Sequence, residues 1–364
     1  MKVTVIHSGP VENLTFCRKL DLFFSTCFLK MSDVSPLSVS DADVILVEFA
    51  DAQDCDLHKL REHREFLDFF PVVAVVDYNS RRECFQADAL RMMNVFDRSD
   101  RLSKVLSLIK RLGAPDLLAA LPEDTPDEMK LIYKQANAHL EAFHLAAVTD
   151  EAIPIESGRE VASNLLTILQ TNGILAWIKM VKFHHNPTYA HSLEVAGFAG
   201  WLACQLDWSE DDCLQVIVGG LLHDIGKSRI PQDLLDEPTD PDGVELNLVQ
   251  KHAQLGYEIL KDRFELDNET KEIVYFHHEM LDGSGYPIGL SGEAINPKVR
   301  VITIADLFTT LTEERAYKPA LSHREAIASM NKMYRKIDQA FYAAFRYGML
   351  SHSDDVRQAE KIAS

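Results

Sequence analysis

The sequence predicts two domains of different class: an α/β domain with a doubly wound parallel sheet, followed by an all-α helical bundle. Short apolar runs alternate with amphipathic stretches up to about residue 112, whereas strand signals nearly vanish from residue 151 onward. The length of 364 residues allows a sizeable core in each domain. We therefore expect domains at 1–112 and 151–364, with a linker and a connecting helix at 113–150.

The first domain alternates apolar runs with helical candidates. Val3–Ile6, Val44–Val47 and Val72–Val76 are short, continuous and apolar, which is typical of buried parallel strands. Leu57–Leu67 and Arg81–Met92 are amphipathic and lie after the second and third runs, so they predict helices. This βα alternation predicts an open α/β sheet.

The strand order and the acidic residues near strand ends resemble a response-regulator receiver domain. Receivers carry an acidic pair after the first strand, where this chain has His7 and Ser8, and Glu48 stands at the phospho-accepting aspartate. The receiver's hydroxyl and lysine positions fall on these residues: Val76 or Asp77, and Asp97 or Arg98. We therefore expect a degenerate receiver-like domain without phosphorylation chemistry; another small α/β domain is the alternative.

The remainder of the chain predicts helices. Gly113–Glu123 contains two prolines and is typical of a domain end. Asp127–Ala147 predicts a helix that connects the domains or mediates dimerisation. Seven amphipathic stretches then predict an all-α bundle: Val161–Phe183, Tyr189–Leu206, Asp211–His223, Leu246–Arg263, Asn268–His277, Arg300–Thr312 and His323–Phe345.

Charge and cysteine usage limit the partners and the compartment. The formal net charge of −19 repels DNA, RNA and anionic lipid, so no long nucleic acid is expected as a partner. A small nucleotide is compatible, because cations in one cleft can reverse the local field. The six cysteines show no metal-binding spacing, which is typical of reduced thiols. Without a signal peptide or a membrane-length apolar run, we expect a soluble cytoplasmic protein with no membrane insertion.

Histidines and aspartates recur in apolar helical settings of the second domain. The apolar stripe through Val195 and Phe198 reaches His191 one turn earlier, so His191 is expected to face the core. A mostly apolar helix runs into His223 and Asp224. A buried imidazole is costly without a partner, and a buried carboxylate needs a cation or strong donors.

Four more residues of this kind follow: His252 within a helix, His277 and His278 at a helix end, and Asp306 inside an apolar run. For each residue alone, a hydrogen-bonded core group is the ordinary interpretation. Five imidazoles and two carboxylates together favour two divalent metal ions, which supply the missing positive charge. A carboxylate can bridge both ions, and imidazole suits iron, manganese, zinc or nickel.

Two motifs in this region carry a specific resemblance. Residues 222–227 read Leu-His-Asp-Ile-Gly-Lys, which resembles the signature of the HD phosphohydrolase superfamily. Residues 277–287 read His-His-Glu-Met-Leu-Asp-Gly-Ser-Gly-Tyr-Pro, which resembles the signature of its HD-GYP branch. That branch is associated with hydrolysis of the bacterial second messenger cyclic di-GMP. The resemblance covers about residues 156–345 and implies an HD-type bundle with these metal ligands: His191, His223, Asp224, His252, His277, His278 and Asp306.

The resemblance also implies a mechanism. Two metal ions, iron or manganese first and zinc or nickel as alternatives, would activate a hydroxide that attacks the phosphodiester in line. Lys227 would neutralise the developing charge, and Asp224 would orient the water. The products would be pGpG, GMP or both; no leaving-group acid is evident. The implied substrate contacts are Lys227, Gly285, Tyr286, Arg315 and Lys318.

Three positions depart from the family pattern. Pro187 replaces a glutamate that some members associate with a third metal, so we expect two ions. Thr309 replaces a second aspartate, and Glu194 replaces an arginine. The changes at Thr309 and Glu194 favour the alternative of a weak or inactive cyclic dinucleotide-binding signalling module, whereas the complete ligand set favours an enzyme. A phosphodiesterase for cyclic GMP-AMP is a further alternative, and a homodimer or a signalling protein could bind through the first domain and connecting helix.

Overall fold

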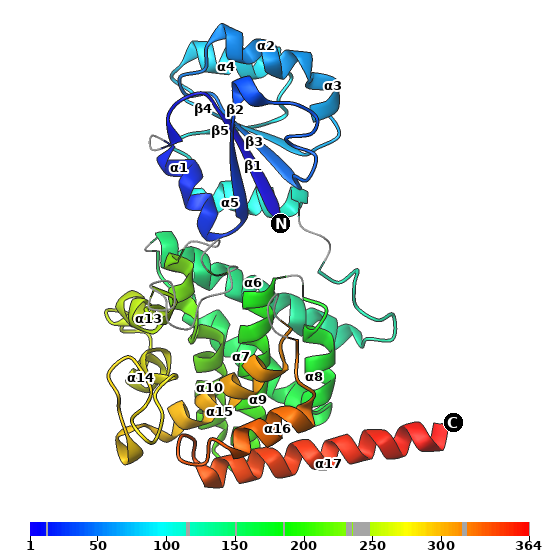
Figure 1. Cartoon of the computed structure of the whole chain (residues 1–364), viewed down its shortest axis with the longest axis vertical. Coiled ribbons are helices and arrows are strands. Elements are labelled where there is room, and N and C mark those ends of the chain that lie inside the picture. Colours follow the sequence, from blue (N-terminus) through cyan, green and yellow to red (C-terminus); the bar gives the residue numbers. More distant parts are fainter. Residues whose placement is uncertain are drawn as a thin grey trace. The chain divides into compact units, whose positions relative to one another are not determined.

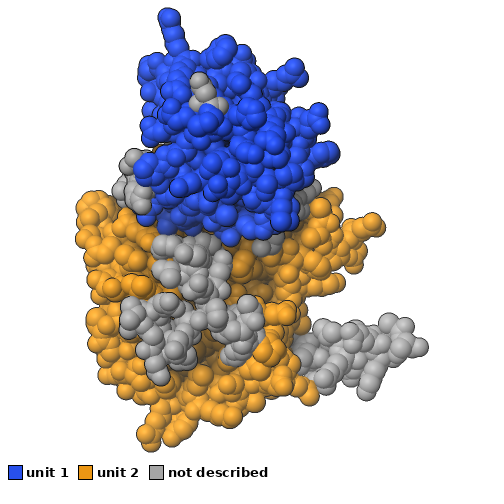
Figure 2. Space-filling view, turned by 45° about the horizontal axis from the view of Figure 1, so that its top comes forward, with its two compact units in different colours: residues 1–116, 231–237 blue, residues 117–230, 238–364 orange. Residues whose placement is uncertain are grey.

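The computed structural model describes residues 1–11, 14–113, 117–149, 151–184, 186–230, 235, 248–314 and 319–363. The chain divides into two compact units, coloured separately in Figure 2. Unit 1 comprises Met1–Asp116 with Pro231–Glu237, and unit 2 comprises Leu117–Ile230 with Pro238–Ser364. The domain limits expected from the sequence, 1–112 and 151–364, stay predictions.

Unit 1 contains a five-stranded, all-parallel sheet in the order β2-β1-β3-β4-β5 (Figure 1). The strands are β1 (Lys2–His7), β2 (Ser25–Lys30), β3 (Val44–Glu48), β4 (Val72–Val76) and β5 (Asn94–Asp97). This is one of the two common doubly wound orders. The predicted parallel α/β sheet is therefore confirmed, and the three predicted strands are β1, β3 and β4.

The helices of unit 1 are α1 (Thr15–Arg18), α2 (Asp54–Glu62), α3 (Arg64–Leu67), α4 (Arg81–Ala89) and α5 (Leu102–Gly113), with 3₁₀ turns η2 (Lys19–Leu22) and η3 (Met31–Asp33). The stretch expected as one helix over Leu57–Leu67 is interrupted at His63, which caps α2 and precedes α3. The helix expected to reach Met92 ends at Ala89, and Arg91 then adopts a positive φ of 52°.

The strand ends of unit 1 place the receiver-like positions at one edge of the sheet. His7, Glu48 and Asp97 end their strands, and parallel strands bring these ends to the same edge. Glu48 is buried there, and its Oε1 lies 2.6 Å from Nη2 of Arg98. The same nitrogen lies 2.8 Å from Oε2 of Glu83. The receiver-like identity of this unit stays a prediction.

The described residues of unit 2 form helices joined by turns and loops, with no β-strand among them, as expected (Figure 1). Its elements are α6 (Asp127–Thr149), α7 (Ile155–Thr171), α8 (Ile174–Val181), α9 (Pro187–Gln205), α10 (Glu210–Leu222), η4 (Ile225–Arg229), α13 (His252–Leu260), α14 (Asn268–Phe276), η5 (Gly292–Ala294), α15 (Pro297–Thr312), α16 (His323–Asn331) and α17 (Gln339–Ala363). Helix α9 is buried on almost every side and packs against α7, α8, α10, α15 and α17. The most buried helix of the unit thus also carries His191.

Two predicted helices of unit 2 are each divided. Val161–Phe183 was expected as one helix, but α7 stops near Thr171 because Gly173 adopts a positive φ of 79° and starts α8 in a new direction. His323–Phe345 is likewise divided into α16 and the start of α17. The helix predicted from Leu246 begins on residues outside the described part of the chain. In the described residues, no helix combines the length and the apolar character that a bilayer span requires.

Candidate metal centre

The seven predicted ligands come from five separate helical segments of unit 2. His191 lies in α9, and Asp306 lies in α15. His223 caps the C-terminus of α10 and Asp224 follows it directly. The other three ligands are His252 at the start of α13, His277 at the end of α14, and His278. The structure brings all seven together, although they span more than a hundred positions in the chain.

One group of ligand atoms forms around His191. Its Nε2 lies 3.2 Å from Oδ1 of Asp306 and 3.7 Å from Oδ2 of Asp224. Nε2 of His223 lies 3.3 Å from the same Asp224 oxygen. His191, His223 and Asp306 are all buried, and their ligand atoms lie within 4.8 Å of one another. This spacing suits a single cation.

The second group consists of three imidazoles. Nε2 of His252 lies 3.1 Å from Nε2 of His277 and 3.2 Å from Nε2 of His278. For a metal–nitrogen bond of about 2.1 Å, two ligands at a right angle would be about 3.0 Å apart and tetrahedral ligands about 3.4 Å. The observed separations lie between these values, so the three nitrogens are spaced as ligands of one ion.

Asp224 lies between the two groups. Its Oδ2 faces His191 and His223, whereas its Oδ1 lies 3.3 Å from Nε2 of His252. The two oxygens of one carboxylate therefore face different sets of imidazoles. This is the arrangement that a carboxylate bridging two metal ions requires.

Backbone hydrogen bonds fix the tautomers of three of these histidines. Nδ1 of His223, His252 and His277 lies 2.7, 2.7 and 3.0 Å from the carbonyl oxygen three residues earlier. A carbonyl only accepts, so each Nδ1 carries the proton and each Nε2 presents a lone pair. Lone pairs of His252 and His277 then face each other at 3.1 Å, and the buried Nε2 of His223 has no hydrogen-bond partner among the described residues. Such a donor set fits a metal ion.

The electrostatics of the site lead to the same conclusion. Burial lowers the pKa of His252 to about 3 and that of His278 to about 4, so both rings stay neutral and able to bind metal. Burial would raise the pKa of Asp224, but Lys227 and His223 lower it well below its usual value. Burial also opposes protonation of His191, yet Asp306 and other nearby carboxylates outweigh it and raise its pKa to about 10. A proton on His191 thus supplies charge that a bound cation would otherwise supply.

The HD segment is shaped by close backbone packing. Turn η4 follows Asp224 and brings Nζ of Lys227 to 2.6 Å from Oδ2 of that aspartate. A Cβ on Gly226 would lie 1.9 Å from the carbonyl oxygen of His252, so only glycine lets η4 approach α13 this closely. A Cβ on Gly220 would lie 2.7 Å from Cα of Ala196, so this glycine lets α10 pack closely against α9.

The loop after the paired histidines holds Tyr286 against the site. Its ring stacks on the ring of His278, with centroids 4.6 Å apart and an interplanar angle of 29°. Glu279 fixes this loop, because its buried Oε1 accepts hydrogen bonds from the amides of Ile288 and Gly289 at 2.8 and 3.0 Å. In the sequence, Glu279 is recognisable only as part of the motif at residues 277–287. Its role in holding the loop is seen only in the folded structure.

The sequence singles out five further positions: two implied substrate contacts and three departures from the family pattern. Arg315 and Lys318 lie outside the described residues. Pro187 is the first residue of α9, and Thr309 is fully buried in α15. Glu194 lies one turn after His191, and burial raises its pKa to about 7.

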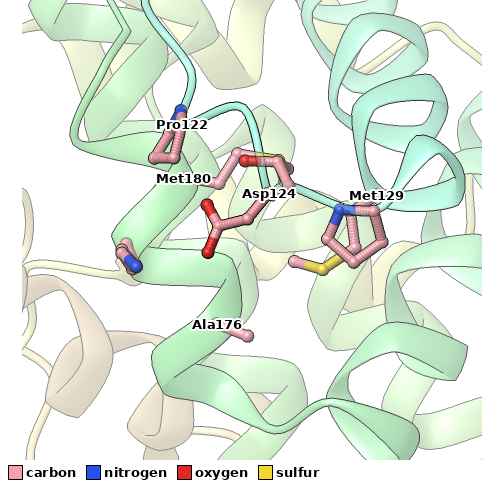
Figure 3. A pocket seen from close by; sticks show the side chains of 8 residues that line it. Pro122, Asp124, Met129, Ala176 and Met180 are labelled. Carbon is pink, nitrogen blue, oxygen red and sulfur yellow. The ribbon is translucent and has the colours of Figure 1, made fainter.

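A separate small hollow lies in unit 2 between the segment before α6 and helix α8 (Figure 3). It is lined by the following residues: Pro122, Asp124, Thr125, Pro126, Met129, Ala176, Lys179 and Met180. None of the predicted ligands lines it, so the metal centre is a different place in this unit.

Comparisons with known proteins agree with this geometry. Residues 176–341 match the family model described as an HD domain. The chain is 32% identical over 189 residues to "Cyclic di-GMP phosphodiesterase PA4108" of Pseudomonas aeruginosa, covering 51% of this chain and 44% of the relative. It is 34% identical over 192 residues to "3'3'-cGAMP-specific phosphodiesterase 3" of Vibrio cholerae, covering 50% and 42%. The chain thus spans less than half the length of these relatives.

A solved structure shares the fold. Bd1817, described as an HDG"Y"P protein from Bdellovibrio bacteriovorus, superposes with a TM-score of 0.51 and 18% identity, covering 69% of this chain and 81% of that one. The family match implies divalent metal ions, and the structure supplies clustered histidines and aspartates for them. Residues 176–341 therefore form an HD domain, and the motifs at 222–227 and 277–287 within it resemble those of the HD-GYP branch.

Proposed function

We propose that this chain is a metal-dependent phosphodiesterase that hydrolyses cyclic di-GMP to pGpG, GMP or both. The observation that carries this proposal is the position of Asp224, whose two oxygens face two separate sets of buried imidazoles. Similarity to proteins named as cyclic dinucleotide phosphodiesterases supports the substrate class. A second messenger as substrate also favours a cytoplasmic location.

The seven clustered residues would hold two divalent ions. His191, His223 and Asp306 would bind one, the three remaining histidines would bind the other, and Asp224 would bind both. Iron or manganese suits this mixture of imidazole and carboxylate, and zinc and nickel are alternatives. When bound, the ions supply Lewis acidity that activates water and polarises the phosphoryl group.

The chain's own residues would position the substrate and balance its charge. Lys227 is about one-fifth exposed and contacts Asp224, so its ammonium can reach a phosphate bound at the metals. Tyr286 and Gly285 would form one wall of the substrate site beside His278. Arg315 and Lys318 stay proposals as contacts to the second phosphate.

Two other functions compete with this proposal. A relative named as specific for 3'3'-cGAMP matches about as well as the cyclic di-GMP relative, so cyclic GMP-AMP is a second candidate substrate. A binding module without turnover is the other, because Thr309 and Glu194 depart from the family pattern. Partners acting through unit 1 stay a prediction.

Anaerobically purified protein tests the proposal directly. Metal content is measured first, and then turnover of cyclic di-GMP, 3'3'-cGAMP and cyclic di-AMP, with chromatography separating linear dinucleotide from mononucleotide. His223→Ala and Asp224→Ala should lose metal and turnover together, while His58→Ala, at an exposed histidine of unit 1, should lose neither. Full metal loading with no hydrolysis of any of the three substrates would favour the binding module instead.

A further inference from the structure

His191 differs from the other candidate ligands in the partner of Nδ1, the ring nitrogen that does not face Asp224 and Asp306. Nδ1 of His223, His252 and His277 pairs with a backbone carbonyl, and two of these histidines lie at helix ends where carbonyls are free. His191 lies inside α9, and its buried Nδ1 makes no hydrogen bond of ordinary geometry among the described residues. A buried donor of this kind calls for an acceptor nearby.

Glu313 provides a carboxylate at this position. Its Oε2 lies 3.5 Å from Nδ1 of His191, while Oδ1 of Asp306 lies 3.2 Å from Nε2 on the other side of the ring. Both acids belong to α15, where Glu313 is the C-cap and Asp306 lies seven residues, or about two turns, earlier. One helix thus supplies a carboxylate to each nitrogen of the same imidazole.

We propose that Glu313 is a positioning residue for His191. The Glu313 carboxylate would accept a hydrogen bond from Nδ1–H, so that the lone pair of Nε2 would be directed at the cation that His191, His223 and Asp306 would hold. The observed 3.5 Å is longer than an ordinary N–H···O distance of about 2.9 Å, and Nδ1 has no hydrogen bond to any other described residue. The backbone amide of Glu313 donates to the carbonyl of Thr309 at 2.9 Å, which anchors the residue.

This inference rests on the proposed metal site and assigns a residue that neither family motif contains. A carboxylate on the outer nitrogen of a metal-binding histidine fixes its orientation and raises its basicity, and losing such a partner costs 10–100-fold in metal affinity. The effect should fall on one of the two ions, because Glu313 lies against His191, which belongs to the first group.

Cobalt(II) binding to metal-free full-length protein tests the role without relying on turnover. Glu313→Ala should weaken one of the two binding events by roughly 10–100-fold and alter the visible spectrum of that ion, leaving the other unchanged. Glu313→Gln keeps an acceptor oxygen of similar reach and should lose less. Glu314→Gln removes the same charge at the exposed neighbouring residue and should bind both ions as the wild type does.

A double-mutant cycle distinguishes positioning from a general structural role. In a His191→Ala background, Glu313→Ala should cause no further loss of affinity, because the group it orients is gone. Wild-type affinity and spectrum in Glu313→Ala, or losses that simply add in the double variant, would overturn the assignment. Wild-type protein that binds two cobalt ions but hydrolyses no cyclic dinucleotide would refute the proposed function alone; failure to bind either ion would refute both.

Discussion

Both units bury carboxylates, but unit 1 neutralises its buried acid with a cation from its own chain. Glu48, at the end of β3, is 1% exposed and lies against the guanidinium of Arg98. Glu83 shares that guanidinium. Burial opposes the charge on Arg98, but the hydrogen bonds with both glutamates raise its pKa above the usual value. This cluster is complete without a ligand.

The buried charges of the cluster in unit 2 are balanced in a different way. Asp224 and Asp306 are both buried, and Lys227 contacts the first of them. The second aspartate is paired with His191, whose proton provides the balancing charge. Buried acids are thus balanced differently in the two units. An arginine balances the acids of unit 1, whereas unit 2 combines Lys227 and a protonated His191 with neutral imidazoles whose lone pairs face one another and so fit added cations.

The largest expected effect comes from Asp224→Asn, which removes the charge shared by both metal groups. Metal content should fall and phosphodiesterase activity should drop by on the order of 1,000-fold or more, since metal charge stabilisation is worth several kcal/mol. Metal analysis and turnover check this, with Asp262→Asn at an exposed position as the control. Normal metal loading in Asp224→Asn would refute the proposal that Asp224 bridges two metal ions.

The next largest effect tests unit 1. Arg98→Met leaves Glu48 buried without its cation and should destabilise the unit by about 3 kcal/mol. Hydrogen exchange at the amides of β1 and β3 measures the loss, while metal content should not change. Adding Glu48→Gln should recover much of the stability, because the unpaired charge is then absent. Unchanged exchange in Arg98→Met would show that the ion pair does not stabilise the sheet.

Adding metal should affect the two units differently, because the candidate ligands lie in unit 2. Metal at a hundredfold excess over its dissociation constant should stabilise unit 2 by about 2.7 kcal/mol for each bound ion, because the ions bind only the folded site. Hydrogen exchange of α9 and α15 should slow, whereas exchange of β1 and β3 should not. Equal protection in both units would mean that metal does not act at the histidine cluster.

The smallest effect concerns a buried histidine away from the ligands. Burial lowers the pKa of His139 to about 4, below the value near 6.5 expected in the unfolded chain. Its contribution to stability is therefore complete above pH 6.5 and is lost as the pH falls towards 4, by on the order of 1–2 kcal/mol. Urea unfolding of metal-free protein at pH 7.5 and 5 should show a smaller pH dependence in His139→Gln. Identical pH dependence in the two proteins would contradict this.

The sequence predicts the central strands of unit 1 better than its edges. β1, β3 and β4 each contain a mostly apolar run because they are the inner strands of the sheet. β2 and β5 are the edges, and the mixed composition of β2 and the four-residue length of β5 give no clear strand pattern. The sequence therefore predicts the sheet class without giving ranges for its outer strands.

The candidate site also combines features that the local sequence predicts with features that it does not. His223 with Asp224, and His277 with His278, are predicted by local motifs, because each pair lies at the end of an apolar helix. The roles of Glu279 and Glu313 depend on contacts made by the folded loop and by two packed helices, and no local sequence pattern encodes such contacts. Motif spacing therefore predicts candidate ligands, whereas the contacts of Glu279 and Glu313 are seen only in the three-dimensional structure.

Anomalous diffraction from crystals of metal-replete protein tests the central claim most directly. We expect two metal peaks, one beside His191, His223 and Asp306 and the other beside the three remaining histidines, with a carboxylate oxygen of Asp224 facing each. A single peak, or peaks away from these side chains, would contradict a two-metal centre.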